Sequence, residues 1–161
     1  MSNQSMREHF TQTLFALLSE TFEQVQGIYL DRGTALFETL ATISADEASR
    51  PVSASCANLA AQVNHVRFYL EVLSEYIQAH PVGKVDWQAS WQVGAVSPAE
   101  WAALTARLRA EYERVVALLR GIESWEGEDE IGGALAIVVH TAYHLGEIRQ
   151  ALCVLRPQSG A

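Results

Sequence analysis

The sequence is poor in cysteine, proline and positive charge, and each shortage excludes a class of protein. Two cysteines among 161 residues are too few for a disulfide-dense secreted scaffold. Four prolines and 49% hydrophobic residues exclude a disordered or collagen-like chain. Eleven Lys and Arg stand against 19 Asp and Glu, and the resulting net charge of −8 argues against a nucleic-acid partner. We therefore expect one globular domain over residues 1–161.

Signals for export and for membrane insertion are also missing. The first ten residues, MSNQSMREHF, contain no apolar signal region. No apolar run approaches the ~18–20 residues that a membrane span requires. We therefore expect a cytoplasmic protein that does not contact a membrane, in which Cys56 and Cys153 remain reduced thiols.

Helical periodicity is what the sequence has in abundance. Apolar residues recur at spacings of three and four along most of the chain, and no stretch alternates as a strand does. The pattern predicts a leading N-terminal helix that runs into a first bundle helix near residues 28–43, a second helix over residues 54–79, a third from the capping sequence at 97–100 to residue 122, and a fourth from Gly132 or Gly133 to a point before Pro157. This is an all-α chain, and we interpret it as a four-helix bundle with an additional N-terminal helical segment.

The connection over residues 81–97 is long for a link between helices, which usually takes ~2–8 residues. It contains Trp87 and Trp91. We expect it to cross one end of the bundle, where the two indoles would pack as plugs.

His140 and His144 are the residues of greatest chemical interest. Four residues apart on a helix, they point within ~40° of each other, which is the spacing at which two imidazoles can share a metal ion. They fall in one apolar stripe with Ile137 and Ile148, so both face the core. Buried imidazoles need polar partners, which a shared metal or separate hydrogen bonds could provide.

His65 is the third candidate ligand. It lies in the middle of the predicted second helix among apolar neighbours, so bundle packing can bring it level with the other two histidines. Three imidazoles from two helices would leave positions open on a divalent ion, as catalytic sites do. His9 and His80 lie at helix ends and are left out.

The remaining polar residues near this pattern have less defined roles. Glu147 follows His144 by three residues and is a candidate fourth ligand, hydrogen-bond acceptor for His144 or general base, or else a solvated carboxylate. Cys56 and Cys153 each lie nine residues from a histidine, about 180° around the helix, and are not expected to be ligands. No histidine follows a glutamate by three residues and no His-Glu-x-x-His occurs, so a di-iron carboxylate site is disfavoured.

The pattern resembles the DinB/YfiT-like family of metalloenzymes. The likeness rests on the run from His140 to Leu152, on Leu59 to His65, and on Asp86-Trp87 with Trp91, and it covers about residues 28–156. The resemblance implies a four-helix bundle, frequent homodimers and a divalent ion, often nickel or zinc, with iron or manganese as further candidates. It assigns the ion to His65, His140 and His144. Relatives usually carry glutamine where Glu147 stands.

These observations lead to one leading functional expectation and one alternative. The first is a metal-dependent transferase, isomerase or hydrolase whose ion acts as a Lewis acid on a small-molecule substrate, with a low-molecular-weight thiol as candidate partner. The alternative is a non-catalytic helical dimer that binds a small ligand or partner and whose metal is structural or absent.

Overall fold

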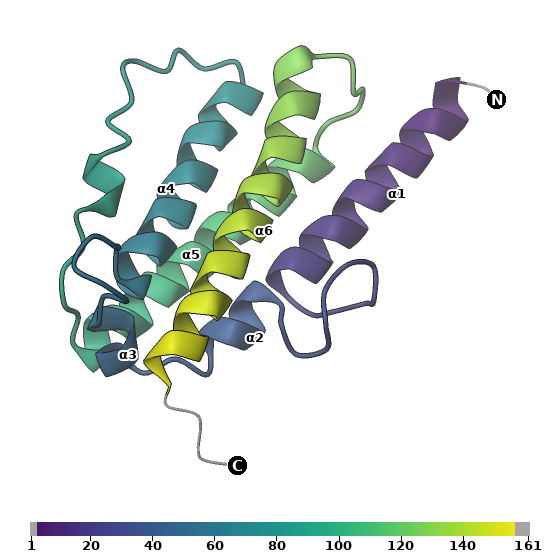
Figure 1. Cartoon of the computed structure of the whole chain (residues 1–161). Helices are drawn as coiled ribbons and strands as arrows, with labels where there is room; N and C mark the ends of the chain where they lie inside the picture. The colour runs from purple at the N-terminus through teal and green to yellow at the C-terminus, as the bar shows by residue number, and fades with distance from the viewer. Residues whose placement is uncertain (1–2, 157–161) are drawn as a thin grey trace.

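The computed structural model describes residues 3–156, and all the regular secondary structure in that range is helical (Figure 1). Four helices are long and two are short. In chain order the elements are α1 (Asn3–Phe22), α2 (Leu36–Leu40), α3 (Ala45–Ser49), α4 (Leu59–Ile77), the 3₁₀ turn η1 (Ala89–Trp91), α5 (Pro98–Arg120) and α6 (Glu128–Leu155).

The four long helices pack side by side around a common apolar core. Helix α4 packs against both α5 and α6, and α1 covers the other flank of α6 (Figure 1). Each long helix contributes leucine or isoleucine side chains that are completely or almost completely buried, among them Leu14, Leu70, Leu108 and Ile148. Burial of this apolar face, rather than helix propensity alone, holds such helices together.

Residues 81–97 run back along α4 instead of crossing an end of the molecule. The side-chain amide of Asn58, at the start of α4, donates to the carbonyls of Val93 and Gly94 at 3.2 and 3.0 Å. Asn64, further along α4, donates to the carbonyl of Ser90 at 2.8 Å. The expectation of a plug across the bundle end is therefore wrong. This return connection also makes α5 start at the same end as α4 (Figure 1).

The helix expected near residues 28–43 is not present as such, and only the short α2 forms there. Gly27 and Gly33 adopt φ of +86° and +74°, which a helix cannot accommodate. The buried carboxylate of Glu20 instead accepts backbone N–H groups from Gln26, Ile28, Tyr29 and Leu30. Its burial raises the pKa, but these four donors outweigh that effect and lower the pKa to about 2. The N-terminal helix is therefore one of the four long helices and not an addition to them.

Other helix boundaries follow local capping. As predicted, Ser97 caps α5: its hydroxyl accepts from Glu100 N–H, and the Glu100 carboxylate accepts Ser97 N–H at 2.7 Å. Helix α4 starts later than expected, at Leu59, because Asn58 is its cap. Helix α6 starts earlier than expected, at Glu128, where three acidic residues in the first turn complement the helix dipole.

Helix α6 meets the length and composition of a membrane span, contrary to the expectation that no segment does. Its most apolar window has a mean hydropathy of 1.2, and 44% of that window is buried against the rest of the protein. Because a buried core helix passes the same test, one such helix is weak evidence for a membrane.

Candidate metal centre

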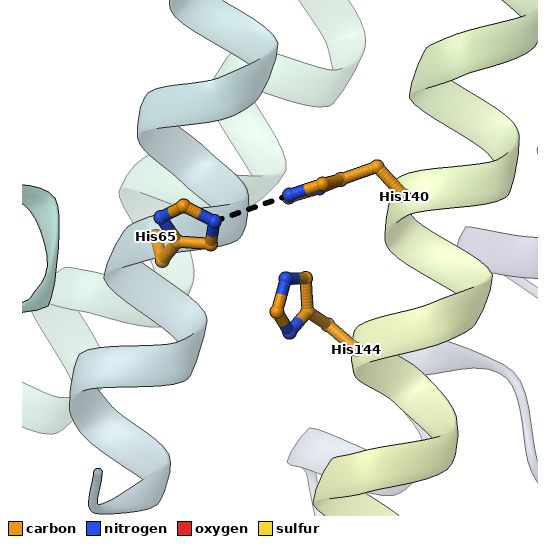
Figure 2. Close-up of side chains that lie close together, drawn as sticks. All are labelled: His65, His140 and His144. Atoms are coloured by element: carbon orange, nitrogen blue, oxygen red, sulfur yellow. Dashed lines mark hydrogen bonds between the residues drawn. The ribbon is translucent and has the colours of Figure 1, made fainter. Parts of the chain in front are cut away.

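His65, His140 and His144 come together between α4 and α6 (Figure 2). One ring nitrogen from each lies within 4.8 Å of the other two. The Nε2 atoms of His65 and His140 are 3.1 Å apart and share a hydrogen bond. The three residues named from the sequence therefore form one cluster.

The positions of these side chains follow from the apolar faces of their helices. On α6, Ile137 and Ile148 are fully buried on the stripe that contains the two histidines, and His144 is only 4% exposed. On α4, His65 is 8% exposed. His140 is partly buried. The predicted core-facing stripe is confirmed.

Ser90, on the return connection, holds the second nitrogen of His65. Its hydroxyl lies 2.7 Å from His65 Nδ1 and donates to the carbonyl of Trp87 at 2.6 Å. Since a hydroxyl has one proton, the imidazole is the donor in the first contact. The Nε2 of His65 is then free of hydrogen and faces the cluster. Ser90 is buried, and no motif in the sequence marked it.

Glu147 holds the second nitrogen of His144 in the same way. Its carboxylate lies 2.8 Å from His144 Nδ1, which donates because an ionised carboxylate can only accept. The Glu147 side chain is 37% exposed. Among the roles considered for it, this geometry matches that of hydrogen-bond acceptor for His144, a contact typical of metal-binding histidines.

Aromatic rings cover the faces of two imidazoles. Tyr69 stacks on His140 with ring centroids 3.6 Å apart and planes at 6°. Trp91 stacks on His65 with ring centroids 4.0 Å apart and planes at 20°, and it makes a T-shaped contact with His144 with ring centroids 5.6 Å apart. These rings keep water away from the imidazole faces and restrict their rotation. Trp91 therefore packs against the histidine cluster, and not at a bundle end.

The three imidazoles are neutral at neutral pH. Burial, together with the smaller effect of the neighbouring His144, lowers the pKa of His65 to about 4, against the opposing effect of Glu147. Burial and the two other histidines lower the pKa of His140 to about 3. Burial also lowers the pKa of His144, against the opposing effect of Glu147. Neutral imidazole is the form that binds a metal ion.

The three histidines lie close enough together to hold a metal ion. Its donors are three imidazoles, with no carboxylate or thiolate in the group, and such ligands suit zinc, nickel, copper and iron. His140 Nδ1 is buried and has no hydrogen-bond partner among the described residues. This nitrogen is not the one that meets His65, so the fit of an ion depends on the three imidazole donors.

The two cysteines lie away from this cluster, as expected. Cys56 and Cys153 are both free and exposed, and neither belongs to the group of candidate ligands.

No family model, no curated protein and no solved structure matches this chain.

Proposed function

We propose that this chain is a metal-dependent enzyme that holds one divalent ion on His65, His140 and His144. The observation that carries the proposal is the convergence of three neutral imidazoles from two helices, with donor atoms within 4.8 Å. Two of the three rings also have the hydrogen-bonded second nitrogen found in metal sites.

A bound ion would supply Lewis acidity and would lower the pKa of a water or thiol at an open position. The side chains around the three histidines fix the orientation of the candidate ligands. Ser90 and Glu147 orient two imidazoles, and Trp91 and Tyr69 cover ring faces. Three protein ligands leave a position open for substrate, which supports transferase, isomerase or hydrolase chemistry on a small molecule such as a low-molecular-weight thiol.

We further propose that the fold is a four-helix bundle of the DinB/YfiT-like type. Four long helices, one histidine on α4, two on α6 and a long connection between α4 and α5 support this assignment. Nickel or zinc is the ion that the resemblance favours.

A homodimer through the outer face of α6 is part of the same proposal. Leu135, Val139 and Tyr143 lie on that face and are 42%, 66% and 61% exposed. The α6 sequence has no charged residue from Ile131 to Gly146. Two copies that each carry a net charge of −8 can therefore meet there without bringing like charges into contact. Val139→Glu should convert a dimer to a monomer in light scattering, and a wild-type monomer would contradict the assignment.

Metal analysis of untagged protein tests the main proposal. We expect about one equivalent of nickel or zinc in the wild type, or uptake of one equivalent by metal-free protein. His65→Ala and His144→Ala should bind far less, while His80→Ala, which changes an exposed histidine paired with Glu75, should bind as the wild type does. A wild-type protein that neither contains nor takes up metal would end the proposal.

A non-catalytic module with a structural metal is the second candidate. The low exposure of His65 and His144 favours it, because structural sites are closed to solvent. Melting with and without a chelator separates the two. A large drop in Tm on chelation, without turnover of any thiol substrate, would favour the structural role, whereas a small drop would favour the enzyme.

A further inference from the structure

A second candidate site lies between α1 and the connection that joins α5 to α6. The N-terminal end of α1 and this connection lie at the same end of the molecule (Figure 1). Together they line a cavity of about 540 Å³, which is within the ~300–1,000 Å³ of small-molecule sites. None of the three clustered histidines lines this cavity, so it is a separate candidate binding site.

Trp125 and Phe10 form an apolar wall of this cavity. Their rings meet edge to face, with centroids 5.0 Å apart and planes at 74°. The indole Nε1–H of Trp125 donates to the Thr11 hydroxyl at 2.8 Å, which ties the connection to α1. Ile131 and the 64% exposed Met6 add further apolar surface. The wall is therefore held in place by the protein's own contacts, and it can bury an apolar or aromatic side chain.

Arg7 and Glu126 are the charged residues that line the same cavity. Both are exposed, and within residues 3–156 neither side chain forms a hydrogen bond or an ion pair. The nearby Glu130 carboxylate, in contrast, already accepts the Gly127 N–H at 3.2 Å. The cavity therefore offers a guanidinium and a carboxylate to a ligand, beside an apolar wall.

This pair of opposite charges restricts the chemistry of the ligand. A purely apolar ligand would remove water from both charged groups and give neither a partner, which costs free energy. An acid without an amine would bring a second negative charge to Glu126, in a chain whose net charge is already −8. An amine without an acid would bring a second positive charge to Arg7. A ligand with a carboxylate, an ammonium group and an apolar side chain matches all three features.

We propose that this cavity binds a small zwitterion with an aromatic or other apolar side chain, which is the chemistry of a free amino acid of that class. Arg7 binds the carboxylate, Glu126 binds the ammonium group, and the wall formed by Phe10 and Trp125 contacts the side chain. The inference goes beyond the proposed metal centre and does not depend on it.

Three probes that share a phenyl ring and differ in charge test the inference: L-phenylalanine, phenethylamine and 3-phenylpropionate. The readout is the indole ¹H–¹⁵N NMR signal of Trp125, assigned with a Trp125→Phe variant, during titration of the full chain. We expect phenylalanine to shift this signal. It should bind about three- to tenfold more tightly than either singly charged probe, as loss of one charge-assisted hydrogen bond at a partly solvated site implies.

Variants at the two charged residues assign the charges of the probe. Arg7→Gln should abolish the preference for phenylalanine over phenethylamine, and Glu126→Gln should abolish the preference over 3-phenylpropionate. Both residues are exposed, so both variants should keep the Tm of the wild type. Arg107→Gln and Glu128→Gln are matched controls, because they remove the same charges from exposed residues outside the cavity, and they should leave all three affinities unchanged.

Several results would overturn the inference. They are a Trp125 signal that phenylalanine does not shift, equal affinity for the three probes, and tighter binding of a singly charged probe. Variants at Arg7 and Glu126 that bind phenylalanine as the controls do would also overturn it. None of these results bears on the proposed metal centre, which metal analysis of the same protein tests.

Discussion

Replacing Gly133 by alanine tests the close approach of α4 and α6, the two helices that carry all three histidines. A Cβ at this position would lie 2.7 Å from Ile77 Cγ1 and 3.1 Å from its Cδ1. Carbon atoms in contact are ordinarily about 3.5–4.0 Å apart, so the helices or Ile77 must shift. A Cβ added at Gly132, the preceding residue on α6, would have no neighbouring atom within 4 Å. Gly132 is a matched control.

The magnitudes follow from two opposing effects. Alanine is favoured over glycine inside a helix by about 0.5–1 kcal/mol. Overpacking a core contact destabilises by about 1–3 kcal/mol. Gly132→Ala should therefore stabilise, and Gly133→Ala should be neutral to destabilising. Both variants gain the same helix preference of alanine over glycine. Their free energies of unfolding should therefore differ by the overpacking cost of about 1–3 kcal/mol, or roughly 2–12 °C in Tm for a domain of this size.

Urea and thermal unfolding followed by circular dichroism measure this difference. Adding Ile77→Ala to Gly133→Ala should restore room for the new methyl group, so the double variant should be more stable than the sum of the single effects implies, with a coupling of about 0.5–3 kcal/mol. Gly133→Ala as stable as Gly132→Ala, or no coupling to Ile77, would refute the close approach.

Three further predictions concern acid sensitivity, the first loop and the thiols. The pKa values of His65 and His140 are about 4 and about 3 in the folded protein, below the usual 6.5, so the unfolded chain binds more protons between these values. The Tm of metal-free protein should therefore fall as the pH drops from about 6.5 toward 4. His140→Gln should make the Tm less dependent on pH in this range. Glu20→Gln should lower the Tm at neutral pH and expose residues 23–35 to limited proteolysis, because four backbone donors lose an ionised acceptor; the contribution of this carboxylate is present above its usual pKa of 4.5 and lost as pH falls toward 2, and an unchanged digest would contradict its role. Cys56 and Cys153 should both react with a thiol reagent in the native protein, and a double serine variant should keep its metal content; loss of metal would contradict the histidine-only ligand set.

Local sequence patterns determined the all-helical class, the start of α5 and the pairing of His140 with His144. Each depends on residues within one or two turns: apolar spacing, a serine cap followed by glutamate, and two imidazoles four positions apart. The prediction of a helix over residues 28–43 failed because the structure there depends on contacts between residues further apart in the sequence. Gly27 and Gly33 were visible as break points, but only folding brought the Glu20 carboxylate to the backbone of residues 26–30 and completed a loop there.

The tertiary structure alone decided how the histidine cluster is completed. His65 was named from its position in a helix and from a family resemblance, but its contact with His140 spans 75 residues and depends on how α4 packs against α6. Ser90 had no signal in the sequence, because a serine in a long connection is ordinary until the chain runs back along α4 and places it 2.7 Å from His65. Short-range patterns thus predicted the candidate ligands, while the long-range path of the chain placed His140 and Ser90 against His65.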